Sequence, residues 1–169
     1  MARNRKMTGV LEMTISNLFS LELIESDLDF ASQEELFDEA FAKLTKLDLV
    51  TENFLTKIIE REKKYPTGLK THKGAVAIPH TDPEYVKESF IYVMRLTQPL
   101  EFNEMGTSIS EGKIVTPKLI FMIGFEKGKQ QPEILKALTT LFSSTEQMSA
   151  IVEATDNQEV YDLLKKYVK

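Results

Sequence analysis

The chain has 169 residues, of which 42% are hydrophobic and 28% charged, and it contains no cysteine and no tryptophan. This length allows one well-buried domain, while the absence of cysteine excludes disulfides, thiolate metal ligands and a thiol nucleophile. The net charge of -5 at pH 7 disfavours a nucleic-acid-binding protein, because such proteins usually present a basic face to the phosphates.

Two amphipathic helices are predicted in the first part of the chain. Ser32 and Glu35 have the spacing of a capping box, and apolar residues recur behind them at helical intervals, which predicts a helix to about Lys46. Thr51 is predicted to cap a second helix. That helix should end near Lys64, because a proline stands two residues further on and disfavours helical geometry before it.

Three β-strands are predicted in the middle of the chain. Val76–Ile78 is a short β-prone segment, and Phe90–Leu96 and Leu119–Phe125 are stronger candidates, rich in β-branched and aromatic residues. The last of these is apolar throughout, as expected for a central strand that helices cover on both faces. The polar, glycine-containing segment Asn103–Lys113 is predicted to be a surface loop.

Three further helices are predicted in the last quarter of the chain. Apolar residues recur at helical spacing over residues 134–141, and helices are also expected over Thr145–Ala154 and Val160–Val168. The whole pattern predicts an α/β fold with a mixed β-sheet flanked by helices on both faces. We expect a single domain over residues 14–169, preceded by a disordered or additional segment over residues 1–13.

One of the two histidines follows a predicted strand, as reactive side chains often do. His80 comes after small residues, which allow close backbone approach, and after Pro79, which restricts the backbone. Imidazole can act as a nucleophile through one nitrogen while a hydrogen bond holds the other. The alternative is an ordinary loop histidine. His72, which stands in a polar stretch between lysines, is more typical of a solvated loop, and the two histidines alone make a poor metal site.

Arg61 belongs to the charged run that closes the second predicted helix. Such a run is usually a solvated helix end, where the helix dipole favours cations. An arginine near a nucleophilic histidine could instead hold phosphoryl oxygens with its forked guanidinium. Nothing in the local sequence shows that Arg61 and His80 meet, so the first interpretation leads until another observation links them. The chain has no Gly-rich phosphate loop, so direct use of a nucleotide is not predicted.

A family resemblance links these residues through three short motifs, Arg61-Glu62, Pro66-Thr67-Gly68 and Ala77-Ile78-Pro79-His80. Together they resemble the phosphotransferase-system IIA domains of the fructose–mannitol type, over roughly Thr14 to Lys169. The resemblance implies a bacterial, cytoplasmic phosphotransferase of the sugar phosphotransferase system. It also implies that His80 accepts a phosphoryl group and that Arg61 stabilises it.

One position departs from the mannitol-type pattern. Those members have a second active-site histidine just ahead of the helix that follows the late strand, where this chain has Gln131. An amide forms hydrogen bonds but cannot carry a proton as imidazole does. The Gln-Gln pair, together with Tyr65-Pro66-Thr67-Gly68, resembles the galactitol-type branch, which implies Gln131 as a possible support for the phosphoryl group. The alternative is a polar residue that merely precedes a helix.

The resemblance further implies a relay between proteins. A histidine-containing phosphocarrier protein would donate the phosphoryl group to His80, and a cysteine of the cognate IIB component would pass it to a sugar, galactitol or a related hexitol, that enters through the membrane IIC component. The relay needs no cofactor, metal ion or nucleic acid. Two alternatives remain open: a IIA-like regulatory module whose phosphorylation state controls a transcription factor or kinase, and a binding domain with an unphosphorylated, relic histidine.

Overall fold

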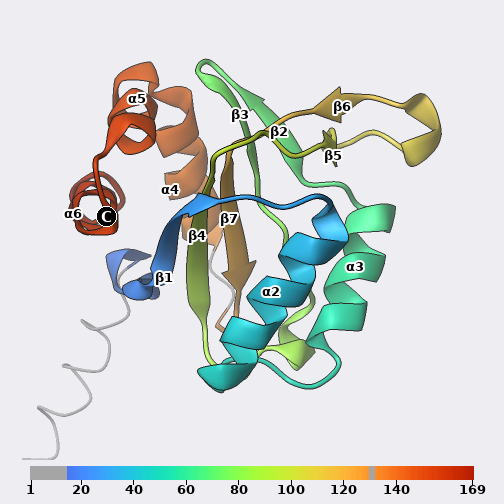
Figure 1. Ribbon diagram of the computed structural model, residues 1–169. Helices are drawn as coiled ribbons and strands as arrows, with labels where there is room; N and C mark the ends of the chain where they lie inside the picture. The colour runs from blue at the N-terminus through green and yellow to red at the C-terminus, as the bar shows by residue number, and fades with distance from the viewer. Residues whose placement is uncertain (1–14, 130–131) are drawn as a thin grey trace, which may run out of the picture.

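The computed structural model describes residues 15–129 and 132–169, so the expectation for residues 1–13 lies outside the described part of the chain. A five-stranded sheet with the order β1-β4-β7-β3-β2 forms its centre (Figure 1). The strands are β1 (Phe19–Leu28), β2 (Gly68–Thr71), β3 (Gly74–Ala77), β4 (Phe90–Leu96) and β7 (Leu119–Gly124). The β1–β4 and β3–β7 pairs are parallel, whereas the β4–β7 and β2–β3 pairs are antiparallel. The mixed sheet that the sequence predicts is therefore confirmed.

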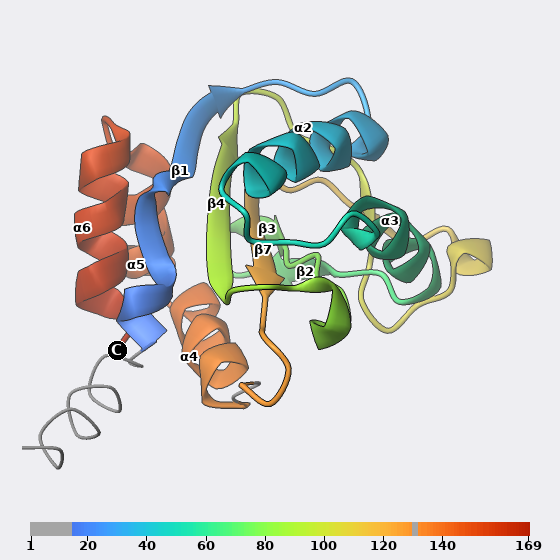
Figure 2. The same ribbon diagram turned by 90° about the horizontal axis from the view of Figure 1, so that it is seen from below.

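Helices cover both faces of the sheet (Figures 1 and 2). One face carries α2 (Gln33–Lys46) and α3 (Phe54–Lys64), and the other carries α4 (Pro132–Ser143), α5 (Thr145–Glu153) and α6 (Asn157–Tyr167). The central strand β7 supplies both cores: Ile120 and Met122 pack beneath α2 and α3, whereas Phe121 and Ile123 pack beneath α4 to α6. This two-sided burial explains why β7 is apolar throughout.

The first predicted helix agrees with the structure. The Ser32 hydroxyl accepts a hydrogen bond from the Glu35 amide at 3.2 Å, as in a capping box. The Glu35 carboxylate reaches back to the amide of Ala31, one residue before the cap, at 2.5 Å. The helix ends at Lys46, where the sequence predicts its end.

The predicted start of the second helix is wrong. Helix α3 begins at Phe54 with Asn53 in the cap position, and no side chain caps it. The Thr51 amide donates to the Tyr85 carbonyl at 3.0 Å, which ties Thr51 to the loop after β3 and leaves a turn before the helix. The Thr51 hydroxyl is buried without a hydrogen-bond partner in the described part of the chain. The helix ends at Lys64, as predicted.

The strand predictions hold for the interior of the sheet and fail at its edges. Strand β4 has the predicted bounds, and β7 ends one residue before the predicted Phe125. The predicted segment Val76–Ile78 overlaps β3. The sequence gives no prediction for β1 or β2, the two edge strands, because polar residues interrupt the first and the second has only 4 residues.

Short elements surround the predicted loop Asn103–Lys113. Strands β5 (Phe102–Asn103) and β6 (Ile114–Val115) pair with each other and border an arm that projects from the sheet (Figure 1). Helix α6 begins three residues before the predicted Val160, where the Asp156 carboxylate caps it. The described 3-10 helices are η1 (Ile15–Leu18), η2 (Pro83–Tyr85) and η3 (Ile109–Glu111). Within the described residues, no helix has both the length and the apolar character that crossing a membrane requires.

Candidate functional site

His80 lies just beyond the end of β3, beside the end of β7. It forms an isolated parallel bridge with Ile123, whose amide donates to the Pro79 carbonyl at 3.0 Å. The imidazole is partly buried, and its Nδ1 lies 2.7 Å from the Ile78 carbonyl oxygen. Because a carbonyl oxygen can only accept a hydrogen bond, Nδ1 carries the proton and Nε2 keeps its lone pair. His80 can therefore act as a nucleophile through Nε2.

The surroundings of His80 favour its neutral form. Burial lowers the pKa of His80 below its ordinary value, because a cation loses solvation there. The bond to Ile78 and the charge of Asp82 oppose this shift, while the positive charge of Arg61 adds to it, and the net pKa stays below the ordinary value. An imidazole with a lowered pKa has its Nε2 lone pair available near neutral pH.

Arg61 and His80 line the same pocket, of about 350 Å³. Arg61 reaches it from the last turn of α3, and its Nη1 donates to Asp82 Oδ1 at 2.8 Å. Its Nε is buried and has no hydrogen-bond partner among the described residues. The structure thus brings together the two residues that the sequence singles out. The local sequence gave no reason to pair Arg61 with Asp82, although an acidic residue two positions after the histidine was visible.

The rest of the pocket wall is mainly apolar. Its apolar lining comes from the loop after His80, the end of β7 and the first turns of α4, through Pro83, Ile123, Phe125, Pro132 and Leu135. The Leu135 side chain is 45% exposed, and Tyr65, which stacks against the Arg61 guanidinium at 5.5 Å, is 55% exposed. Large apolar side chains that remain exposed around a reactive group are typical of a surface where proteins dock.

Glu62 and Thr67 form a buried pair; in the sequence analysis they appear only as members of two motifs, with no role predicted for either. The Glu62 carboxylate accepts hydrogen bonds from the Thr67 amide at 2.9 Å and from the Thr67 hydroxyl at 2.8 Å. Burial raises the pKa of Glu62 to about 7, although both bonds from Thr67 act in the opposite direction. Glu62 stands eight positions after the buried Phe54 and four after the buried Ile58, and this helical spacing is the signal that could have predicted an inward-facing carboxylate.

Gly68 completes this motif for a steric reason. A Cβ atom on Gly68 would stand 2.5 Å from Val115 Cγ2 and 2.6 Å from the Asn103 carbonyl oxygen. The Met105 amide also donates to the Gly68 carbonyl at 2.7 Å. The projecting arm therefore packs directly on the backbone of β2 beside Thr67, and a side chain at this position would push it away.

His72 and Gln131 are the remaining candidate residues. His72 is exposed in the turn between β2 and β3 and does not line the His80 pocket. Gln131 lies outside the described residues, so its predicted support of the phosphoryl group remains a prediction. Over residues 15–129 and 132–169, no three histidine, aspartate or glutamate side chains gather as a metal site would require.

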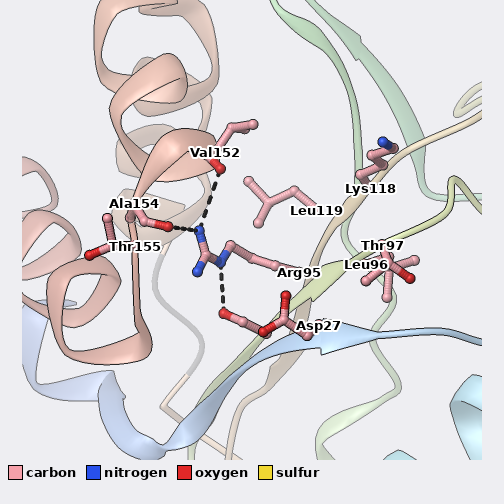
Figure 3. A pocket seen from close by; sticks show the side chains of 10 residues that line it. Asp27, Arg95, Leu96, Thr97, Lys118, Leu119, Val152, Ala154 and Thr155 are labelled. Carbon is pink, nitrogen blue, oxygen red and sulfur yellow. Dashed lines mark hydrogen bonds between the residues drawn. The ribbon is translucent and has the colours of Figure 1, made fainter.

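A second pocket, of about 290 Å³, lies at the opposite end of the sheet, where β7 begins (Figure 3). Its central side chain is Arg95, whose Nε donates to the Ser26 hydroxyl at 2.8 Å and whose Nη1 donates to the Ala154 carbonyl at 2.8 Å. Arg95 also donates to carbonyls at the end of α5. These bonds join β1, β4 and α5, so Arg95 has a structural role and the His80 pocket remains the candidate site.

The amino-acid sequence matches a described family over most of its length. The model of the family "Phosphoenolpyruvate-dependent sugar phosphotransferase system, EIIA 2" matches residues 17–167. The galactitol-specific EIIA component of Escherichia coli K12 is 23% identical over 154 residues, which cover 91% of this chain and 97% of that protein.

Two solved structures share the fold. Mannitol enzyme IIA of Escherichia coli, determined in complex with phosphorylated mannitol enzyme IIB, is 18% identical and has a TM-score of 0.69, covering 88% of this chain and 97% of that chain. The nitrogen regulatory protein IIA-Ntr of Neisseria meningitidis is 25% identical and has a TM-score of 0.62, covering 89% of this chain and 98% of that chain.

Proposed function

The chain belongs to the EIIA 2 family of the phosphoenolpyruvate-dependent sugar phosphotransferase system, and on that premise we propose that His80 carries its phosphoryl group. The chain is accordingly a phosphotransferase with galactitol-type relatives. The observation that carries the proposal is the 2.7 Å contact between His80 Nδ1 and the Ile78 carbonyl, since it leaves Nε2 as the nucleophile in a pocket with Arg61.

The donor in this proposal is a histidine-containing phosphocarrier protein. The lone pair of His80 Nε2 forms a bond to phosphorus in line with the phosphorus–nitrogen bond of the donor, which breaks and returns its electron pair to the donor imidazole. Nδ1 keeps its proton, held by the Ile78 carbonyl. In such a transfer, the protein contributes mainly by positioning the reacting groups and by stabilising the charge on the phosphoryl group.

Arg61 is the residue that stabilises the transferring group in this proposal. Its guanidinium lines the same pocket as His80 and forms an ion pair with Asp82. The Asp82 side chain is 60% exposed, so water can replace Arg61 as its hydrogen-bond partner when a phosphoryl group binds the guanidinium. The buried Arg61 Nε has no partner among the residues that the structure describes. A phosphoryl group on His80 Nε2 can accept hydrogen bonds from a forked guanidinium in bidentate fashion. Gln131, ahead of α4, is proposed as a further donor.

The proposed acceptor is the cysteine of a cognate IIB component, whose thiolate would attack the phosphorus and release the His80 imidazole. The mannitol neighbour was solved with its phosphorylated IIB partner, which supports a partner of this class. Donor and acceptor would dock in turn on the apolar rim that includes Tyr65 and Leu135. Acting on the cytoplasmic side of a membrane IIC component, the route would serve the uptake of galactitol or a related hexitol, as the galactitol-specific relative suggests.

A regulatory role is the second candidate. The likeness to IIA-Ntr favours it, since that protein is named as a nitrogen regulatory protein. In that case the phosphorylation state of His80 would control a transcription factor or kinase, and no IIB component would take the phosphoryl group onward.

One experiment tests both roles. The protein is incubated with phosphoenolpyruvate, the first enzyme of the relay and the phosphocarrier protein, the label is mapped, and the phosphoprotein is then offered a panel of IIB domains. We expect an acid-labile, base-stable label that His80→Ala abolishes and transfer to a galactitol-type IIB. A label that survives in His80→Ala would refute the assignment of His80. A labelled protein that no IIB domain discharges would favour the regulatory role, and a preference for a mannitol- or fructose-type IIB would refute the galactitol branch.

A further inference from the structure

Glu62 stands next to Arg61 in the sequence, but its side chain is buried against Thr67 and does not line the pocket. We propose that Glu62 is a positioning residue for phosphoryl transfer: through Thr67 and the backbone of Ile78, it holds the His80 ring in the orientation and tautomer that present Nε2. This inference rests on the phosphocarrier role proposed for His80.

A continuous series of hydrogen bonds connects Glu62 to His80. The Glu62 carboxylate accepts two hydrogen bonds from Thr67, at 2.9 Å and 2.8 Å. The Thr67 carbonyl accepts from the Ile78 amide at 3.2 Å, and the Ile78 carbonyl accepts from His80 Nδ1 at 2.7 Å. Glu62 and Thr67 are 5% and 3% exposed, so water has little access to compete for these bonds.

The backbone around His80 depends on few such bonds. Strands β2 and β3 pair in register from Thr71 and Gly74 to Gly68 and Ala77, and the regular pairing ends there. From Ile78 to Pro79, the backbone hydrogen bonds of the described residues are the one from the Ile78 amide to the Thr67 carbonyl and the one from the β7 backbone to the Pro79 carbonyl. Proline itself has no amide proton to donate. A displacement of Thr67 would therefore move the backbone of Ile78, whose carbonyl selects the His80 tautomer.

Stability gives a weak reason for a carboxylate at this position. In the described part of the chain, the other buried polar side chains are threonines, Thr67 and Thr81. Burying a carboxylate loses its solvation, which is reflected in the pKa of Glu62 of about 7, and well-packed apolar residues often stabilise such a site equally well. What an apolar residue could not provide is a pair of acceptors that fixes both polar groups of Thr67.

The positioning role requires hydrogen-bonding geometry rather than charge. Glutamine at position 62 could accept from the Thr67 amide with its oxygen and donate to the Thr67 hydroxyl with its NH2 group. Alanine could do neither. Glu62→Gln and Glu62→Ala therefore separate the position of Thr67 from the ionisation of the side chain.

The test compares these two variants in the full chain and includes Arg95→Met as a matched control. Arg95→Met also removes hydrogen bonds, which are partly buried and lie at the opposite end of the sheet. Two quantities are measured: the tautomer of His80 in the unphosphorylated protein, from the nitrogen NMR shifts of its ring, and kcat and KM for phosphorylation by the phosphocarrier protein.

We expect Glu62→Ala to lower kcat roughly 10- to 100-fold with little change in KM, because small displacements of a reacting group cost about this much and Glu62 is not on the docking surface. The Nδ1-protonated tautomer should give way to a mixture. Glu62→Gln should restore both, and Arg95→Met should change neither. If Glu62→Ala fails to fold, Thr67→Val, which removes only the hydroxyl bond, should change both in the same direction by less.

The proposal is overturned if Glu62→Ala keeps the wild-type tautomer and kcat, if Glu62→Gln behaves like alanine, or if Arg95→Met reproduces the loss at a similar drop in Tm. The tautomer is read without any phosphorylation. A chain that is not phosphorylated on His80 would therefore refute the proposed function while the NMR result still decides whether Glu62 positions the ring.

Discussion

The guanidinium of Arg61 is bound to the carboxylate of Asp82, 21 positions along the chain, in the pocket that contains His80. The side chains of Arg61 and Asp82 are 32% and 60% exposed, so solvent screens the pair and its contribution to stability is at most about 1 kcal/mol. Its consequence is positional: Asp82 keeps a cation beside the nucleophile before any phosphoryl group arrives.

The first prediction concerns this cation. Arg61→Ala should slow phosphorylation of His80 about a hundredfold, because losing one charge-assisted donor at a transition state costs about 3 kcal/mol. Arg61→Lys should restore only part of the rate, since the forked geometry is lost. Rapid-quench measurement of label uptake gives the rates. Lys63→Gln, an exposed residue on the same helix, is the control and should leave the rate unchanged; equal losses in both variants would contradict a specific role for Arg61.

The second prediction concerns the pH dependence of transfer. Because burial lowers the pKa of His80, its neutral form should persist below the ordinary value of 6.5. Protonation of Nε2 removes the lone pair that attacks phosphorus, so the phosphorylation rate should fall to half of its plateau only at a pH below 6.5. NMR titration of the ring gives the pKa directly. A midpoint above 6.5 in the titration would contradict the structure.

The third prediction concerns stability and Glu62. Its pKa is about 7 in the folded protein against 4.5 for an unperturbed group, so between these values the folded state holds a proton that the unfolded state has lost. The free energy of unfolding should therefore fall as the pH rises from about 4.5 through about 7. At about 1.4 kcal/mol per pKa unit, the loss is on the order of 3 kcal/mol.

Urea unfolding of the wild-type protein and Glu62→Gln at about pH 5 and about pH 8 measures this effect. Glutamine does not ionise, so the variant should lack this loss and gain stability relative to the wild-type protein at the higher pH. Parallel stability profiles for the two proteins would show that the Glu62 carboxyl group titrates alike in the folded and unfolded states.

The fourth prediction separates the two accounts of Thr51. As a helix cap, Thr51 would contribute about 1 kcal/mol. In the structure its hydroxyl is buried without a partner among the described residues, so Thr51→Val should leave the free energy of unfolding unchanged or raise it by up to about 1 kcal/mol. Ser32→Ala is the control, because the Ser32 hydroxyl does cap a helix and its loss should cost about 1 kcal/mol. An equal loss of unfolding free energy in Thr51→Val and Ser32→Ala would indicate that Thr51 caps a helix after all.

The interior elements could be predicted from the sequence because the residues that become buried are apolar or follow helical spacing. Strands β4 and β7 consist mainly of apolar residues, and the capping box of Ser32 and Glu35 indicates the start of α2. The edge strand β1 could not be predicted in this way. Its polar residues interrupt any alternation, and its pairing with β4 contains register shifts, so its partner holds it in place more than its own pattern does.

From the sequence alone, His80 is predicted to follow a strand and Arg61 to end a helix, and the motifs that contain them resemble one family. That both residues line one pocket, that Asp82 binds Arg61, and that the neighbouring Glu62 is buried against Thr67 is seen only in the folded chain. The physical reason is that helix and strand periodicity follows from neighbours along the chain. Hydrogen bonds between distant residues depend on how the sheet and α3 pack, and that is set by the burial of the whole core.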